Sequence, residues 1–265
     1  MRKTRFALAF YTYAVIGLLI YLPIVILIVF SFNDSRVLSL PWKGFTLRWY
    51  ATALQRPDLH KAIWTSLWIA AVVTVVSLVL GVLAANAMAR YRYRGRLLFT
   101  GYVALPFVVP WLLLGIALLL FFNRVGVPLS ALTIILSHIA FDVPLVAVLV
   151  AARMHQFDPW LEAAARDLGC TPWQAFRYVT LPIIAPAVIA AGIFAFNWSF
   201  DAFVVTHFVS GTQVTFPLWV WSALRYSKNL PVINAVSSVI VVVEMGLVLL
   251  AEVLRRRGDA GDSWL

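Results

Sequence analysis

Residues 62–89 read AIWTSLWIAAVVTVVSLVLGVLAANAMA and contain no Lys, Arg, Asp or Glu. An α-helix needs about 20 apolar residues to cross the hydrocarbon core of a bilayer, and this run is longer. Further charge-free runs lie at 6–33, 97–123, 125–141, 178–200 and 202–224. Hydrophobic residues make up 63% of the 265 residues, whereas soluble domains average roughly 45–50%. The sequence therefore predicts an all-α, polytopic membrane protein.

The apolar runs predict how the chain crosses the bilayer. Six transmembrane helices are expected, at about 7–32, 61–89, 97–122, 129–152, 183–209 and 232–254. The first apolar stretch is too long for a cleaved signal peptide, so we expect it to remain as a span. The loops on the side of both termini hold 13 of the Lys and Arg residues, and the other loops hold 8. Because the more basic side faces the cytoplasm, both termini are expected there.

The net charge of +10 does not indicate a nucleic-acid partner, since the basic residues cluster at the ends of spans and face lipid headgroups. The single cysteine, Cys170, excludes an intrachain disulfide. The four histidines have no metal-ligand spacing, and no phosphate-binding loop or hydrolase motif is present. We therefore predict no catalytic residue, no metal site and no cofactor bound by this chain.

A polar segment at 157–182 interrupts the apolar sequence. Asp158 can cap a helix that has Pro159 at its first position, and Gly169 can end it. Thr171 can cap a second helix that begins at Pro172. The segment therefore predicts two short amphipathic helices joined by a tight turn at the cytoplasmic surface.

The first of these helices places Leu161, Ala164, Ala165 and Leu168 on one face. A helix that lies on lipid is the alternative, but such helices favour bulky apolar residues opposite Lys. The alanines instead permit a close approach by another protein. We therefore expect this face to meet a protein partner.

Gly169, followed by nine residues and then Val179-Thr180-Leu181-Pro182, resembles the EAA loop of ABC importer permeases. In that family the loop reads EAA, three residues, Gly, nine residues, Ile, any residue, Leu-Pro. It forms a coupling helix that docks into a groove of the cytoplasmic ATPase. The family glutamate would fall at Ala163, but the glutamate here is Glu162, and a shift of one residue turns a helical side chain by about 100°. The residues that the resemblance implies for ATPase coupling are Glu162, Ala163, Ala164, Ala165, Asp167, Gly169, Leu181 and Pro182.

The resemblance covers most of the chain. Segments 21–36, 44–50, 90–96, 137–164 and 216–225 are similar to the second permease of spermidine/putrescine importers. This implies that residues 1–265 are one transmembrane domain of a permease subunit. The subunit would form half of the path for a small cationic solute, and spermidine or putrescine is the leading candidate for that solute. Related branches carry other small amines, amino-acid-like compounds, phosphonates or iron chelates. The implied partners are a second permease in a heterodimer, two ATPase subunits that bind ATP and Mg, and an external, periplasmic substrate-binding protein. The resemblance also implies that this chain is a multi-pass protein of the bacterial plasma (inner) membrane.

Ionisable residues inside spans point to function by default, because burying them in a bilayer is costly. Three occur here, Asp142, Asp201 and Glu244. Asp201 is flanked by Trp198 and Phe200, and a carboxylate among aromatic rings suits a passing ammonium group. For the aromatic residues packing is the alternative, and for Asp142 it is capping of a kinked helix before a proline. Asp201, Trp198, Phe200 and Asp142 are the predicted substrate-pathway residues. The polyamine branch that the chain resembles tends to have a second acidic residue directly after the first, and this chain departs from it with Ala202.

An ion-coupled carrier or an intramembrane enzyme is the alternative to a permease subunit. A carrier formed by one chain shows inverted repeats, and the sequence has no convincing internal repeat. An enzyme needs a nucleophile with its base, or a metal cluster, at one depth, and none is visible. The permease subunit is therefore the leading prediction.

Overall fold

A computed structural model describes residues 2–35, 41–226 and 230–261, and nearly all of them are helical. The elements are α1 (Arg2–Phe30), α2 (Arg48–Leu54), α3 (Pro57–Arg90), α4 (Arg96–Val108), α5 (Trp111–Val125), α6 (Ala131–Met154), α7 (Trp160–Asp167), α8 (Pro172–Ala175), a π-helical turn (Phe176–Thr180), α9 (Leu181–Asp201), α10 (Val204–Val209), α11 (Phe216–Tyr226) and α12 (Leu230–Gly261). The only extended pairing among these residues is an isolated bridge between Asn33 and Phe45. The all-α prediction is confirmed.

Four described helices are long and apolar enough to cross a membrane: Pro57–Arg90, Ala131–Met154, Pro172–Asp201 and Leu230–Leu254. The bent pair α4 and α5 adds a fifth if it is counted as one span. Within α1, Val15–Phe30 is an apolar helical stretch of the residues whose side chains the structure describes. The predicted count of six spans is thus not confirmed by the described residues.

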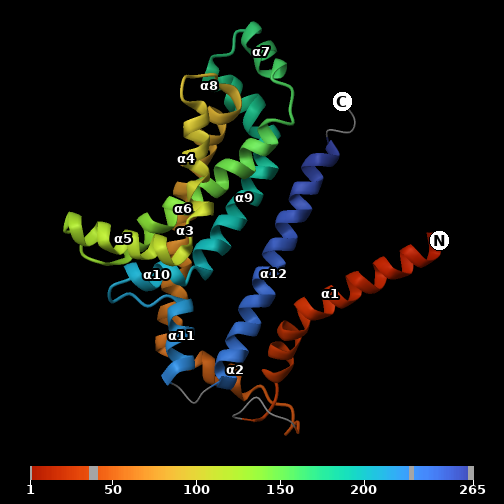
Figure 1. The fold of residues 1–265 in the computed structure, drawn as a ribbon, viewed down its shortest axis with the longest axis vertical. Helices are drawn as coiled ribbons and strands as arrows, with labels where there is room; N and C mark the ends of the chain where they lie inside the picture. Colours follow the sequence, from red (N-terminus) through yellow and green to blue (C-terminus); the bar gives the residue numbers. More distant parts are fainter. Residues whose placement is uncertain (1, 36–40, 227–229, 262–265) are drawn as a thin grey trace. The chain divides into compact units, whose positions relative to one another are not determined.

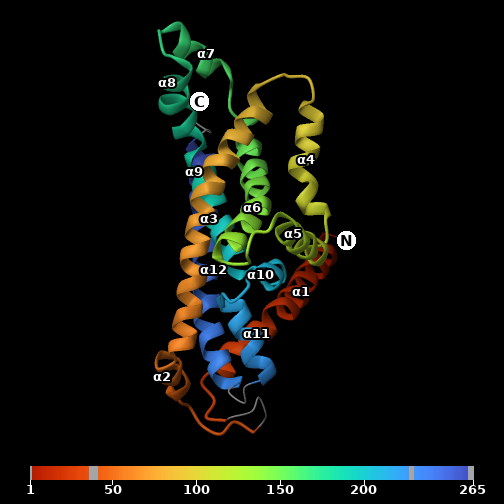
Figure 2. The same cartoon turned by 90° about the vertical axis from the view of Figure 1, so that its left-hand side faces the viewer.

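The predicted single helix at 97–122 is wrong, because the chain bends by 106° between α4 and α5. Val109 is extended, with φ −74° and ψ 125°, and Pro110 follows with φ −57° and ψ 133°. A proline ring clashes with a preceding residue in the helical region, so Val109 cannot continue α4. Figure 2 shows α5 running across the direction of α4 after this break.

The predicted helix at 183–209 is also broken, at Ala202, which has φ −65° and ψ 103°. No proline or glycine lies at this break, so the cause is tertiary. His138 of α6 is fully buried and bonds the Ser199 hydroxyl at 2.8 Å and the Thr206 hydroxyl at 2.9 Å. The imidazole thereby joins the end of α9 to the start of α10, and it holds the two helices in their broken arrangement.

The described chain divides into two units, which are considered separately. One comprises Lys61–Leu218 and the residues from Met245 on. Its core is formed by α3, α6 and α9, and α6 and α9 lie side by side (Figure 1). A Cβ at Gly81 would lie 2.5 Å from Val146 Cγ1, so α3 and α6 approach more closely than a side chain would allow. The apolar core residues include Ala85, Val146, Val150, Met154, Ile184, Ala191 and Ala195.

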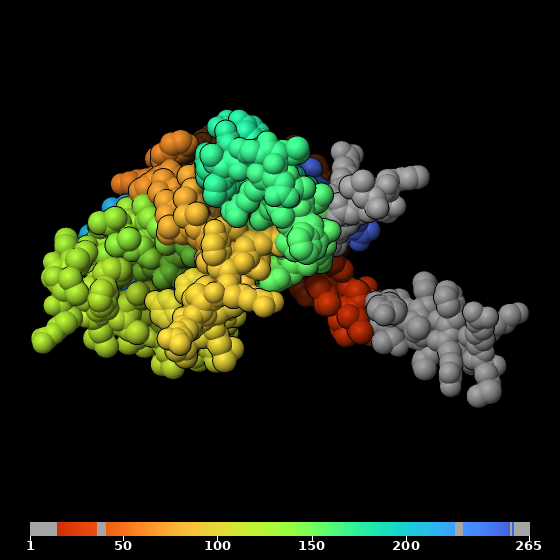
Figure 3. Space-filling view, turned by 90° about the horizontal axis from the view of Figure 1, so that it is seen from above, coloured from red at the N-terminus to blue at the C-terminus, as the bar shows by residue number. Residues whose placement is uncertain are grey.

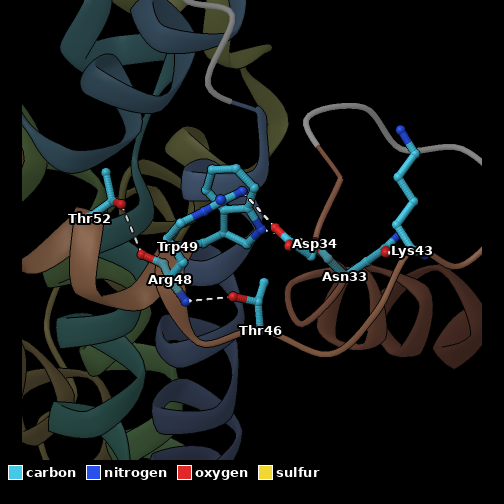
Figure 4. Close-up of polar contacts among 7 residues, drawn as sticks. All are labelled: Asn33, Asp34, Lys43, Thr46, Arg48, Trp49 and Thr52. Carbon is cyan, nitrogen blue, oxygen red and sulfur yellow. Dashed lines mark hydrogen bonds and ion pairs between the residues drawn. The ribbon is translucent and has the colours of Figure 1, made fainter.

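The other unit comprises the residues up to His60 and Trp219–Glu244. In it, polar contacts tie α2 and Lys43 to Asn33 and Asp34, which follow α1 (Figure 4). The buried Trp49 indole donates to the Asn33 carbonyl at 2.9 Å, and the Lys43 N–H donates to Asn33 Oδ1 at 3.0 Å. Arg48 forms an ion pair of 2.6 Å with Asp34. The first two bonds satisfy the Asn33 carbonyl and the Lys43 N–H, two backbone groups that lie outside the helices.

Candidate functional site

The polar segment forms the end of its unit beyond α6 and α9, where α7 and α8 lie (Figure 1). Figure 3 looks onto this end, and the green and teal atoms of the segment stand beside orange and yellow atoms of α3 and α4. The helix α7 begins at Trp160, one residue later than predicted, with Pro159 at the N-cap. Asp158 lies one residue before this N-cap, and its side chain still makes the expected bond to the start of the helix, because Asp158 Oδ1 accepts from the Trp160 N–H at 2.9 Å.

Gly169 ends α7 in a left-handed conformation with φ +92°. The Cys170 N–H donates to the Ala165 carbonyl at 3.0 Å, and the Gly169 N–H donates to the Arg166 carbonyl at 2.9 Å. This pair of bonds is the Schellman motif, which satisfies the last carbonyls of a helix. The predicted turn at Gly169 is confirmed, and its geometry requires a residue that tolerates positive φ.

The second predicted helix begins as expected, but it does not stop after a short length. Thr171 and Gln174 cap it reciprocally, with bonds of 3.3 and 2.8 Å, and Pro172 occupies its first position. It then continues through the π-helical turn into α9, so the prediction of a separate short helix is wrong. Pro182 lacks an N–H and its ring crowds the carbonyl four residues earlier, which lies in the wider π-helical turn. The turn thus lets the helix pass the proline without stopping.

Glu162 points toward its own unit. Its Oε1 accepts from Arg90 Nε at 3.2 Å and from the Thr180 hydroxyl at 2.7 Å. The Arg90 guanidinium also lies 4.0 Å from the centre of the Phe157 ring. The side chains of Arg90 and Glu162 are only 13% and 24% exposed, so this ion pair is partly shielded from water. Ala163, at the register of the family glutamate, is half-buried.

The depression beside this ion pair has a volume of about 300 Å³. Its wall includes Asn86, Arg90, Tyr91, Glu162, Ala163, Arg166 and Phe176. Sequence reasoning missed Arg90 as a member of the site, because it was counted only among the basic residues that set orientation. No spacing signal could have found it, since 72 residues separate it from Glu162.

The outward surface of the segment carries several large apolar side chains among charged and polar ones. The exposed apolar side chains are Trp160, Leu161, Leu168, Trp173, Tyr178 and Leu181, of which Leu168 is 88% exposed. No residue of α7 is buried. Ala164, Asp167 and Pro182 are also exposed, while Ala165 is half-buried. Among the predicted coupling residues, Ala164, Asp167, Gly169, Leu181 and Pro182 are thus exposed, Ala163 and Ala165 are half-buried, and Glu162 is turned inward.

The predicted pathway residues fall into two sets. Asp201 is exposed at the end of α9, and Trp198, three residues earlier on the same helical face, is 38% exposed with its ring 5.7 Å from that of Trp111. Phe200 is buried, and so is Asp142, whose carboxylate oxygens have no hydrogen-bond partner among the described residues. A solute passing along the surface of this unit can therefore meet Asp201 and Trp198 but not Phe200 or Asp142.

Within the described ranges, no group of three His, Cys, Asp or Glu side chains could hold a metal ion. Two features remain as candidate sites: the exposed apolar side chains of the polar segment, and the Asp201 carboxylate three residues from the Trp198 indole.

Comparison with known proteins places this geometry in a family. The profile of the binding-protein-dependent transport system inner membrane components matches residues 77–259. The chain is 34% identical over 247 residues to the spermidine/putrescine transport system permease protein PotC of Escherichia coli (strain K12), covering 92% of this chain and 93% of that protein. It is 37% identical over 229 residues to the putrescine transport system permease protein PotI of the same strain, covering 83% and 81%.

A solved structure shares the fold. In the crystal structure of a bacterial ABC transporter involved in the import of the acidic polysaccharide alginate, one chain superposes with a TM-score of 0.75 at 18% identity, covering 97% of this chain and 96% of that chain. The family match and the two permease relatives confirm the predictions of a transport permease and of its family. This chain belongs to the binding-protein-dependent transport system inner membrane components.

Proposed function

We propose that this chain is one of two permease subunits of an ATP-driven importer for a small cationic amine, with spermidine or putrescine as the cargo. The observation that carries the proposal is its similarity, over most of its length, to two permeases that are both named for putrescine transport. The chain would form half of the translocation path, and a second permease would form the other half.

Energy would come from a partner ATPase dimer that binds ATP and Mg, since this chain has no nucleotide-binding motif. The exposed apolar side chains of residues 157–182 support a docking role, because the free energy of the system falls when a partner covers side chains such as Leu168 and Trp173. Closure of the ATPase dimer would displace this surface and would move the helices attached to it as rigid bodies.

The cationic cargo is supported by Asp201 and Trp198. An exposed carboxylate attracts an ammonium group, and an indole three residues away adds a cation–π contact worth about 0.5–2 kcal/mol. Phosphonates are anions that this pair would repel. An external binding protein would deliver the amine, in keeping with the name of the family.

The proposed orientation has both termini and residues 157–182 on the cytoplasmic side. It rests on the excess of Lys and Arg in those loops. In a chain whose native cysteine is replaced by serine, a cysteine at Gly44 should react with an impermeant reagent added outside intact cells, and one at Arg94 should not. The reverse labelling would contradict the orientation.

The whole proposal is tested by reconstitution. The chain, the second permease, the ATPase and the binding protein are placed in proteoliposomes, and uptake of labelled putrescine and spermidine is measured with ATP on the cytoplasmic side. We expect uptake that needs ATP, Mg and the binding protein. Uptake driven by an ion gradient without ATP would support a carrier instead. ATP-driven uptake of a phosphonate or an iron chelate, but of neither amine, would exclude the cationic cargo.

A further inference from the structure

Three segments that are distant in sequence meet at the carboxylate of Glu162. Arg90 is the last residue of α3, Glu162 lies in α7, and Thr180 ends the π-helical turn before α9. Arg90 Nε and the Thr180 hydroxyl donate to the same oxygen, Glu162 Oε1, at 3.2 and 2.7 Å. The Phe157 ring packs against the Arg90 guanidinium at 4.0 Å. One carboxylate therefore joins the polar segment to α3 and to the root of α9.

The backbone connects the polar segment directly to α6 and to α9 only. Helix α3 ends far upstream, and the long stretch containing α4 and α5 separates it from the segment. The last residue of α3 is the charged Arg90. Its buried Nη2 atom has no hydrogen-bond partner among the described residues. Glu162 is thus the charged group that holds Arg90, in a setting where solvent screens the pair only partly.

We propose that Glu162 is a positioning residue that couples α3 to the polar segment through Arg90, so that a displacement of the segment moves α3 together with α6 and α9. The inference rests on the proposed docking of this segment to an ATPase. It assigns Glu162 an intrachain role, in keeping with its position one residue away from Ala163. The Oε1 atom of Glu162 is committed within the chain, because both Arg90 and Thr180 donate to it.

The test uses the reconstituted four-component complex and measures amine transported per ATP hydrolysed. The variants are Glu162→Gln, Arg90→Gln, the double variant and the conservative Arg90→Lys. The matched control is Glu252→Gln, which removes a carboxylate from an exposed ion pair with Arg256 in α12. We expect each single glutamine variant to lower the ratio about tenfold, from the loss of a charged hydrogen bond. The double variant should fall no further than either single variant, because both act through one contact.

Arg90→Lys should retain more of the ratio than Arg90→Gln, and Glu252→Gln should leave it unchanged. A normal ratio in Arg90→Gln combined with a large loss in Glu162→Gln would overturn the inference, since Glu162 would then act on a partner. Normal ratios in both would overturn it as well.

Hydrogen exchange of residues 157–168 in the same complexes gives a reading that does not depend on transport. We expect faster exchange in Glu162→Gln and in Arg90→Gln to an equal extent, and no change in Glu252→Gln. Unchanged exchange in both variants would refute the tie between α3 and the segment. A wild-type complex without ATP-driven uptake would contradict the proposed function, and the exchange measurement would still decide whether Glu162 positions α3.

Discussion

Substitution of Gly169 should uncouple ATP hydrolysis from transport in a graded way. Gly169 has φ +92°, and nothing lies within 4 Å of the Cβ that a larger residue would add. The cost of a substitution there is therefore conformational and not steric. For an L-residue the left-handed region costs about 1–2 kcal/mol. Gly169→Ala should thus shift the equilibrium between the formed and the unformed turn by a factor of about 5–30.

The substitutions should follow a fixed order of severity. Gly169→Asn should be mildest, because asparagine visits this region more readily than other residues. Gly169→Val should exceed alanine, since a β-branched residue there is a strong outlier. Gly169→Pro should be worst, because proline locks φ near −65° and removes the N–H that bonds the Arg166 carbonyl at 2.9 Å.

The assay is the ratio of amine uptake to ATP hydrolysis in proteoliposomes, with assembly of the complex checked by size-exclusion chromatography. Gly95→Ala is the matched control, because Gly95 has φ +89° and an equally open surrounding but lies before α4. It should carry a similar conformational cost and should leave the ratio near wild type. A Gly169→Ala variant with a normal ratio, or an asparagine variant as damaging as valine, would refute the reasoning.

Three further changes test the packing and the pathway. Gly81→Ala should destabilise the purified protein by about 1–3 kcal/mol, seen as a lower unfolding midpoint, because the new Cβ would lie 2.5 Å from Val146 Cγ1; a variant with the wild-type midpoint would argue against this contact. His138→Ala should lower the free energy of unfolding by at least about 2 kcal/mol, because the buried hydroxyls of Ser199 and Thr206 lose their imidazole partner. A variant as stable as wild type would show that these hydroxyls find other partners. Asp201→Asn should strongly reduce uptake of the amine while assembly and binding-protein affinity stay unchanged, and near-normal uptake would remove Asp201 from the pathway.

Local signals in the sequence were sufficient to predict the polar segment. The cap at Asp158, the turn at Gly169 and the cap at Thr171 each depend on residues within five positions, and the structure contains all three. The long helices were predictable for a similar reason, because charge-free runs of this length have few other stable states. Pro110 signalled an extended residue before it, but the angle of 106° depends on how α5 packs.

Contacts between distant residues were beyond the sequence. The break at Ala202 has no local breaker and depends on an imidazole of another helix. The ion pair of Arg90 and Glu162 likewise joins helices whose relative placement a single sequence does not encode. The division of the predicted pathway residues also required the structure, since Asp142 and Asp201 look alike as isolated acids in apolar runs.

The π-helical turn has a mechanical consequence. Because it lets α8 run into α9 without a stop, Pro172–Asp201 forms one helical rod of 30 residues. At 1.5 Å per residue the rod is about 45 Å long. A tilt of about 5° around its α8 end sweeps the Asp201 end through about 4 Å, close to the width of an extended amine chain. Widening one turn of backbone thus converts a small rotation at one end into a stroke of useful size at the other.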